Sequence, residues 1–217
     1  MTLFGVYGYG GCGRDIMPVL RQQLAHMATP HELVFIDDGR TAPDVVNGQR
    51  VLSWMAFLAE PAADRKATLA IANSVVRERV AAQCAQVGVG FVTVRAASAL
   101  VLDAVEMAEG ASLAPFVTIN SNIRIGRQFH ANMYSYVAHD CVIGDFVTFA
   151  PSVKCNGNVV IEDHAYIGTG AILRQGKPGA PLVIGRGAVV GMGAVVTKSV
   201  APGVTVVGNP ARPLQKD

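Results

Sequence analysis

The chain has 217 residues, of which 51% are hydrophobic and 16% charged, a composition that suits a substantial core and excludes a disordered protein. The formal net charge of +2 and the lack of a basic run give no indication of a nucleic-acid partner. No stretch reaches the roughly 18 consecutive apolar residues of a membrane span, and the start lacks the basic region of a signal peptide. The four cysteines show no CxxC spacing. We therefore expect a cytoplasmic protein with reduced thiols, no membrane insertion and no metal.

The first half of the sequence alternates strand-like and helix-like segments. A short apolar run at residues 3–7 precedes a segment with helical spacing of apolar residues at 14–27. Further strands are predicted at 33–36 and 68–71, and a second helix at 75–87. Strands that alternate with helices predict a small Rossmann-like α/β domain with a parallel sheet.

A glycine-rich turn joins the first strand to the first helix of this domain. Gly8, Gly10 and Gly13 have the GxGxxG spacing, and Asp37 and Asp38 follow after the next strand. Strand, glycines, helix and acidic residue together form a dinucleotide-binding fingerprint. Any pyrophosphate gains from the open amides of such a helix N-terminus, so both NAD(P) and a nucleotide-sugar fit this turn.

From residue 101 the pattern changes to a period of six. The first position of each unit is apolar or small, and a second such residue follows four places later. The first positions are Val101, Met107, Leu113, Ile119, Ile125, Ala131, Val137, Ile143, Phe149, Cys155, Ile161, Ile167 and Leu173. The register breaks at residues 174–181 and resumes at Ile184.

A six-residue period predicts a short strand followed by a turn, with three such units closing one triangular coil. A single unit cannot bury its apolar face, whereas stacked coils build a continuous core. We therefore expect two domains, an α/β domain at 1–95 and a parallel β-helix at 96–217. The segment 174–181 is expected to be a loop pushed out from one corner of the helix.

The repeat resembles the hexapeptide pattern of left-handed β-helix acyltransferases. The ending Gly-Asn-Pro-Ala-Arg-Pro at 208–213 is similar to the tail of the same enzymes. An α/β domain with a glycine-rich turn, followed by this helix with Val-Ala-His-Asp-Cys-Val-Ile-Gly-Asp at 137–145, resembles the bacterial nucleotide-amino-sugar N-acetyltransferases. The resemblance implies acetyl-CoA as the acetyl donor, a nucleotide-linked 4-amino sugar as the substrate, and a homotrimer with CoA between neighbouring helices.

Acetyl transfer from a thioester to an amine needs a base that accepts the proton of the amine. Histidine is the usual choice because a free imidazole is largely neutral and basic near pH 7. The resemblance places the general base on His139, beside a corner of its coil, and its acidic partner on Asp140. The remaining histidines have no comparable context and are expected to be structural or at the surface: His26, His31, His130 and His164.

The carbonyl of the thioester needs a hydrogen-bond donor where negative charge develops, and a backbone amide at a glycine-rich corner supplies one. Gly157 is the candidate for this donor. The resemblance adds acetyl-CoA contacts at Thr148, Thr169 and Met192, the last two through the backbone. Relatives often carry a histidine in place of Thr148, whose hydroxyl still provides a donor.

The nucleotide-sugar is assigned to the α/β domain. We expect Gly10, Gly11 and Cys12 along the phosphates or nucleoside, Asp37 and Asp38 at the base or ribose, and Ala72 at the end of a further strand as the resemblance implies. In addition, Asn73 and Arg77 are either part of this site or a helix N-cap and a surface charge.

Several alternatives remain open from the sequence. The acceptor could be a sugar hydroxyl, as in O-acetyltransferases, or the chain could be a non-catalytic β-helix scaffold or nucleotide-sensing module. An NAD(P)-dependent oxidoreductase is a further reading of the glycine-rich turn. The carrier could be GDP, UDP or CMP, and Lys177, Lys198 and Arg212 are candidates by charge for the 3′-phosphate of CoA.

Overall fold

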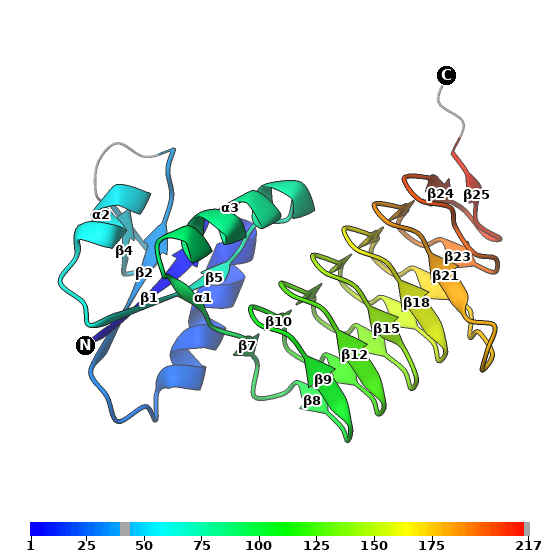
Figure 1. Cartoon of the computed structure of the whole chain (residues 1–217), viewed down its shortest axis with the longest axis horizontal. Coiled ribbons are helices and arrows are strands. Elements are labelled where there is room, and N and C mark those ends of the chain that lie inside the picture. Colours follow the sequence, from blue (N-terminus) through cyan, green and yellow to red (C-terminus); the bar gives the residue numbers. More distant parts are fainter. Residues whose placement is uncertain (40–43, 215–217) are drawn as a thin grey trace. The chain divides into compact units, whose positions relative to one another are not determined.

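The computed structural model describes residues 1–39 and 44–214. The chain divides into two compact units, Met1–Ala96 and Ala97–Asp217, where the sequence placed the division after residue 95 (Figure 1). Within the described residues, no helix is both long and apolar enough to cross a membrane.

The N-terminal unit is a sheet with helices between its strands. The strand order is β3-β4-β2-β1-β5-β6, and its pairs are parallel except β3 with β4. Its elements are β1 (Thr2–Tyr7), α1 (Gly11–Leu24), β2 (His31–Ile36), β3 (Asp44–Val46), β4 (Gln49–Leu52), α2 (Trp54–Ala59), β5 (Asp64–Leu69), α3 (Ser74–Gln86), β6 (Gly90–Phe91) and β7 (Val94–Arg95).

Helices α1 and α3 and strands β1, β2 and β5 lie close to the predicted segments, because each buries an apolar face. Phe4 and Val6 of β1 pack with Ile16, Met17 and Leu20 of α1 in one buried cluster. Ile16 and Leu20 belong to the helical spacing that the sequence shows, and their packing against β1 gives that spacing its reason.

The prediction missed the β3–β4 hairpin and helix α2. The hairpin turns at Asn47-Gly48, whose φ angles of 49° and 76° suit this dipeptide, and an Asn-Gly pair between short apolar runs is the signal for such a hairpin. Helix α2 has six residues, too few to show a helical period, and its start is fixed by Ser53, whose hydroxyl accepts from the Ala56 amide at 3.2 Å.

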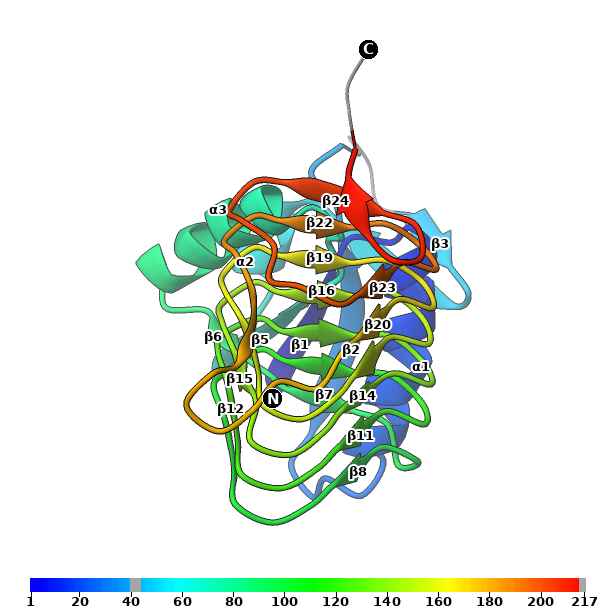
Figure 2. The same ribbon diagram turned by 90° about the vertical axis from the view of Figure 1, so that its right-hand side faces the viewer.

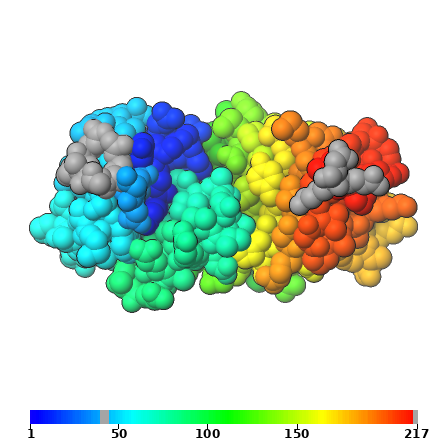
Figure 3. Space-filling model, turned by 90° about the horizontal axis from the view of Figure 1, so that it is seen from above, coloured from blue at the N-terminus to red at the C-terminus, as the bar shows by residue number. Residues whose placement is uncertain are grey.

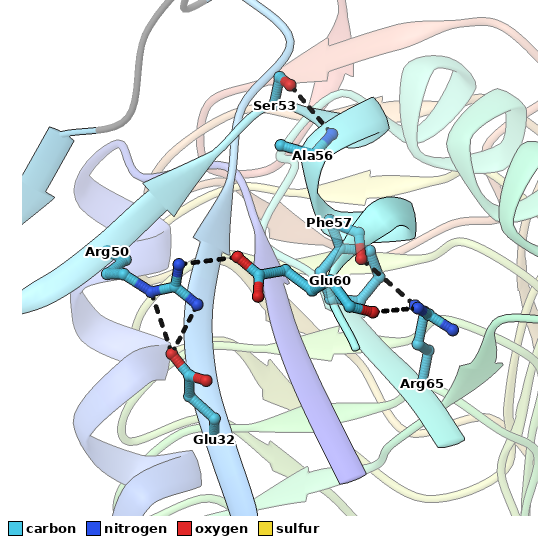
Figure 4. Close-up of polar contacts among 7 residues, drawn as sticks. All are labelled: Glu32, Arg50, Ser53, Ala56, Phe57, Glu60 and Arg65. Atoms are coloured by element: carbon cyan, nitrogen blue, oxygen red, sulfur yellow. Dashed lines mark hydrogen bonds and ion pairs between the residues drawn. The ribbon is translucent and has the colours of Figure 1, made fainter. Parts of the chain in front are cut away.

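Two arginines tie α2 to its neighbours (Figure 4). Arg50 contacts Glu32 at 2.8 Å and Glu60 at 2.7 Å. Arg65 donates to the carbonyl oxygens of Phe57 and Glu60, at the C-terminal end of α2. These last carbonyls have no partner within the helix, so Arg65 satisfies acceptors that a short helix leaves exposed.

The second unit is a three-faced parallel β-helix (Figure 2). The first face contains β10 (Ser112–Leu113), β13 (His130–Ala131), β16 (Thr148–Phe149), β19 (Tyr166–Ile167), β22 (Val189–Val190), β24 (Thr205–Val207) and the antiparallel β25 (Arg212–Pro213). The second contains β8 (Leu100–Val101), β11 (Thr118–Ile119), β14 (Tyr136–Val137), β17 (Lys154–Cys155), β20 (Ile172–Leu173) and β23 (Val195–Val196). The third contains β9 (Val105–Met107), β12 (Ile123–Ile125), β15 (Val142–Ile143), β18 (Val159–Ile161) and β21 (Leu182–Ile184).

The six-residue repeat is the strand-and-corner unit of this β-helix, as predicted. Its first positions from Leu113 to Leu173 are all buried, while Val101 and Met107 in the first coil are half-buried. Successive coils follow one another in chain order, from green to red in Figure 3, and paired residues such as Leu113 and Ala131 lie eighteen positions apart. The segment 174–181 forms the expected loop, closed by a bridge between Lys177 and Ala180.

Each coil turns at three corners, and each corner has a residue with positive φ. The first corner, between the second and third faces, has Ala104, Asn122, Asp140 and Asn158. The second corner, between the third and first faces, has Gly110, Gln128, Phe146, His164 and Gly187. The third corner, between the first and second faces, has Phe116, Tyr134, Ser152, Gly170 and Gly193.

The glycine that often follows the first position of the repeat is required by the next coil. A Cβ atom on Gly144 would overlap the carboxylate of Asp163, which accepts a hydrogen bond from the Asp145 amide at 2.8 Å. Coils therefore stack at their corners through side-chain carboxylates as well as through the strand ladders.

Candidate functional site

His139 and Asp140 occupy the first corner of the β-helix. The Nδ1 atom of His139 lies 2.7 Å from Oδ2 of Asp140, and their side chains are 49% and 47% exposed. Asp140 is the corner residue itself, with φ of 59°, a conformation that aspartate and asparagine tolerate better than most residues. The corner thus presents a solvent-accessible imidazole whose second nitrogen, Nε2, makes no hydrogen bond within the described part of the chain.

Gly157 lies directly against the ring of His139, one coil further on. A Cβ atom added to Gly157 would lie 2.7 Å from Nε2 and 2.6 Å from Cε1 of His139. The Asn158 amide donates to the His139 carbonyl at 3.0 Å, which fixes the two segments together. The Gly157 amide donates no hydrogen bond within the described part of the chain and is therefore available to a ligand.

Side chains missed by the sequence reasoning hold this corner from both sides. On the outside, the Tyr136 hydroxyl donates to Oδ1 of Asn156 at 2.8 Å, and Nδ2 of Asn156 donates to the Leu173 carbonyl at 2.8 Å. On the inside, the Cys141 thiol lies 3.3 Å from the carbonyl oxygen of Asn156. The hydrogen bond with Cys141, together with burial, raises the pKa of Cys155 well above its ordinary value. The eighteen-residue coil spacing could have placed Asn156 and Cys141 beside His139, but not the direction of their bonds.

The predicted acetyl-CoA residues lie elsewhere on the β-helix. Thr148 is 5% exposed and belongs to β16 on the first face. Thr169 is exposed and Met192 is 82% exposed, and each directly precedes a positive-φ glycine of the third corner. Neither the Thr169 nor the Met192 amide donates a hydrogen bond among the described residues. In one chain, therefore, Gly157 and His139 share one corner, whereas Thr169 and Met192 share another.

The glycine-rich turn of the N-terminal unit opens helix α1. Gly10 is the N-cap of the helix, and neither Gly10 nor Gly11 has an atom near the position of a Cβ. A Cβ on Gly13 would overlap the Gly8 carbonyl, so this glycine permits the close packing of the turn on the helix. Cys12 follows within the first turn, and burial, together with the nearby Asp15, raises the pKa of its thiol.

Asp37 and Asp38 line a pocket of about 370 Å³ at the carboxyl ends of the parallel strands, together with Tyr7, Gly8, Ile71, Val76, Arg79, Val80 and Gln83. Oδ1 of Asp37 accepts from the Gly39 amide at 2.9 Å. Asp38 accepts from the Tyr7 hydroxyl and, at 3.1 Å, from the Trp54 amide. Burial and the Asp38 hydrogen bond raise the pKa of Tyr7, so its hydroxyl stays protonated and donating. The pocket also contains Arg79 and Gln83, which the sequence reasoning did not identify.

The segment after β5 has structural tasks. Ala72 is exposed, and Asn73 is the N-cap of α3, accepting from the Val76 amide at 3.0 Å. Arg77 is fully buried, donates to the carbonyls of Ile71 and Ala72, and burial lowers its pKa to about 10. Arg77 is thus not a surface charge, and it braces the loop that carries Ala72.

Two of the three basic residues considered for the CoA phosphate lie near each other. Lys198 and Arg212 line a pocket of about 350 Å³ beside β23, β24 and β25, and Lys177 lies in the loop at 174–181. Among the described residues, no group of three or more His, Cys, Asp and Glu side chains could hold a metal ion.

A parallel β-helix built from hexapeptide coils, with an imidazole–carboxylate pair at a corner, defines an acyltransferase of the hexapeptide-repeat class. No protein-family model matches the sequence. GDP-perosamine N-acetyltransferase from Escherichia coli O157:H7 is 51% identical over 217 residues, which make up 100% of this chain and 98% of that protein. The chain therefore belongs to the GDP-perosamine N-acetyltransferase family and is a sugar N-acetyltransferase.

Solved structures agree with this assignment. WeeI from Acinetobacter baumannii AYE superposes with a TM-score of 0.95 at 56% identity, over 99% of this chain and 100% of that one. The acetyltransferase domain of PglB from Neisseria gonorrhoeae FA1090, in complex with acetyl coenzyme A, superposes with a TM-score of 0.85 at 28% identity, over 98% of each chain.

Proposed function

We propose that this chain transfers the acetyl group of acetyl-CoA to the 4-amino group of GDP-perosamine, in the synthesis of a bacterial surface glycan such as the O-antigen. The observation that carries the proposal is the hydrogen-bonded His139–Asp140 pair beside the unused amide of Gly157. The substrate comes from the full-length relative, a GDP-perosamine N-acetyltransferase. We place the reaction in the cytoplasm, where thiols such as those of this chain stay reduced.

In this mechanism Asp140 accepts a hydrogen bond from the Nδ1–H of His139, which keeps the proton on Nδ1 and leaves Nε2 with a free lone pair. Nε2 takes a proton from the sugar amine as the nitrogen attacks the thioester carbonyl. The Gly157 amide donates to the carbonyl oxygen as negative charge develops on it. His139 then returns the proton to the departing sulfur of CoA, so no net proton stays on the enzyme.

We place the nucleotide in the N-terminal unit, which we interpret as a Rossmann-like domain. The free amides of Gly10, Gly11 and Cys12 at the start of α1 suit a pyrophosphate. The pocket with Asp37 and Asp38 lies at the carboxyl ends of the strands, where open α/β sheets bind nucleotides. Exposed Ala72 would border the same ligand.

We further propose that the enzyme is a homotrimer. On one chain, Gly157 on the first corner is separated from Thr169 and Met192 on the third corner by the second face, so acetyl-CoA would have to lie across that face to contact all three. A neighbouring copy that supplies the third corner solves this problem. Buried Thr148 would then contribute through the local backbone or after a rearrangement of its side chain.

The first test is acetyl transfer by the purified enzyme, followed through release of the CoA thiol and the mass of the sugar product. Wild type is expected to acetylate GDP-perosamine and to prefer it to a UDP-linked 4-amino sugar. His139→Asn is expected to lower kcat by about 10²-fold or more, because general-base catalysis contributes that much.

Asp140→Asn is the matched variant for the partner carboxylate. Asparagine occupies the equivalent corner positions at Asn122 and Asn158, so the backbone is preserved. The amide can hold the ring in the wrong tautomer, and we expect kcat to fall by about tenfold or more. An ester-linked product would instead show O-acetylation, and an undiminished His139→Asn would refute the catalytic assignment.

A further inference from the structure

Two cysteines occupy positions in the β-helix core that are aliphatic in the other coils. Inward side chains repeat every eighteen residues, so Cys141 belongs to a column with Val105, Ile123, Val159 and Leu182. The column of Cys155 contains Ile119, Val137, Leu173 and Val196. In the described β-helix, thiols occur only in the coils that carry His139 and Gly157.

The Cys141 thiol is directed at the peptide that bears the proposed oxyanion donor. Its Sγ lies 3.3 Å from the carbonyl oxygen of Asn156, whereas Sγ of Cys155 lies 3.8 Å from the same oxygen. The carbonyl and the N–H of a trans peptide point in opposite directions. Because the Asn156 carbonyl points inward to the thiols, the Gly157 N–H points outward, on the side where the His139 ring lies.

We propose that Cys141 is a positioning residue, which holds the Asn156–Gly157 peptide so that the Gly157 N–H faces the reacting carbonyl. Glycine allows the peptide plane to rotate more freely than any other residue, so this plane needs an anchor. The side chain of Asn156 is fixed from outside by Tyr136 and Leu173, but these bonds do not hold its carbonyl. Only the thiols satisfy that carbonyl among the described residues.

The same thiol also lies near the carbonyl of His139, although its single hydrogen can be donated only once and the Asn156 oxygen is the nearer acceptor. Sγ of Cys141 lies 3.6 Å from the His139 carbonyl, the oxygen that accepts from the Asn158 amide. Cys141 is 1% exposed and contacts no solvent, so an aliphatic side chain would fill its place equally well if packing were its sole task. The hydrogen bond to the Asn156 carbonyl gives a reason for sulfur at this position.

The test compares Cys141→Val, Cys141→Ser and Cys155→Val in the full-length enzyme, and it rests on the proposed acetyl transfer. Valine matches Val105 and Val159 in the same column, so the fold is expected to keep or gain thermal stability. We expect Cys141→Val to lower kcat by about threefold to thirtyfold, less than the 10²–10³-fold cost of deleting a whole oxyanion donor. The KM for both substrates should stay within about twofold, and Cys155→Val should have the smaller effect.

Serine keeps a donor at this position, so Cys141→Ser should recover most of the lost kcat. A kcat of Cys141→Val within about twofold of wild type overturns the inference. A loss that follows thermal stability and is not restored by serine overturns it as well, because that is the behaviour of a packing residue. Cys141→Ala replaces the valine variant if the latter does not fold.

The His139→Asn variant separates this inference from the proposed function. If His139→Asn abolishes transfer and Cys141→Val does not slow it, acetyl transfer stands and the role of Cys141 is wrong. If His139→Asn leaves transfer intact, the proposed base is wrong whatever the cysteine variants show.

Discussion

At the scale of single residues, the corner at His139 is packed so closely that a single added atom would displace the imidazole ring. The imidazole has its acid partner at 2.7 Å on one edge and the Cα atom of Gly157 on the other. The glycine therefore does two things: it lets the ring lie close to the backbone, and its own amide remains free for a ligand. Any side chain at position 157 would push the His139 ring away from the backbone.

Gly157→Ala is expected to disable the base without unfolding the β-helix. The new Cβ would lie 2.6 to 3.0 Å from three ring atoms of His139, so the ring must rotate away from Asp140. We expect kcat to fall by about tenfold to 10²-fold, since misplacement of a catalytic group by about 1 Å costs this much. Steady-state kinetics and a thermal melt check this. Gly90→Ala, at an exposed residue of β6 where the nearest atom to the new Cβ is 4.0 Å away, is the control, and full activity of Gly157→Ala would contradict the geometry.

At the scale of elements, the repeat predicted the coils well because stacking forces every strand into one register. The alternation of α1, α3 and the longer strands was also visible, since each has a buried apolar face. The positive φ angles of Phe116, Tyr134 and Phe146 were not visible in the sequence. Aromatic residues disfavour this conformation in isolation, and the stacking between coils imposes it. The direction of the Asn156 carbonyl could not be predicted from the sequence either, because it depends on contacts with thiols from two coils.

The second corner contains a carboxylate that links coils in a pH-dependent way. Burial would raise the pKa of Asp145, but hydrogen bonds from the Arg127 side chain and amide outweigh burial and lower it. A lowered folded pKa means that Asp145 stabilises the fold above its unfolded value of about 4, and that this contribution is lost as pH falls through the folded pKa.

We therefore expect Asp145→Asn to melt at a lower temperature than wild type at pH 7, by the equivalent of about 1 kcal/mol, and the difference to shrink toward pH 3. Thermal melts of both proteins at pH 7, 5 and 3.5 measure it. Asp103→Asn removes an exposed carboxylate that makes no ion pair among the described residues and controls for net charge. A difference that is constant with pH would show that the Arg127–Asp145 pair does not carry this stability.

At the scale of the whole molecule, the arrangement of corners limits where acetyl-CoA can bind. The amides of Thr169 and Met192 are unused and exposed on the third corner, in the same positions along the coil as Pro115 and Pro151. Those prolines show that the corner needs no amide hydrogen there. Proline at Thr169 and Met192 should therefore remove two donors and leave the fold intact, in contrast to most proline substitutions.

Mixed oligomers test whether the base and these donors come from different copies. His139→Asn retains the third corner, and the Thr169→Pro, Met192→Pro double variant retains the base, so each alone should be slow at low acetyl-CoA. If neighbouring chains share each site, mixed trimers isolated through two different tags should regain about a third of wild-type activity, because each mixed trimer has both corners intact at one of its three sites. If one chain builds the whole site, the mixed oligomer will not exceed the sum of the two variants. Isolation through both tags ensures that only mixed assemblies are measured, and thermal melts of the proline variant confirm that the coils are intact.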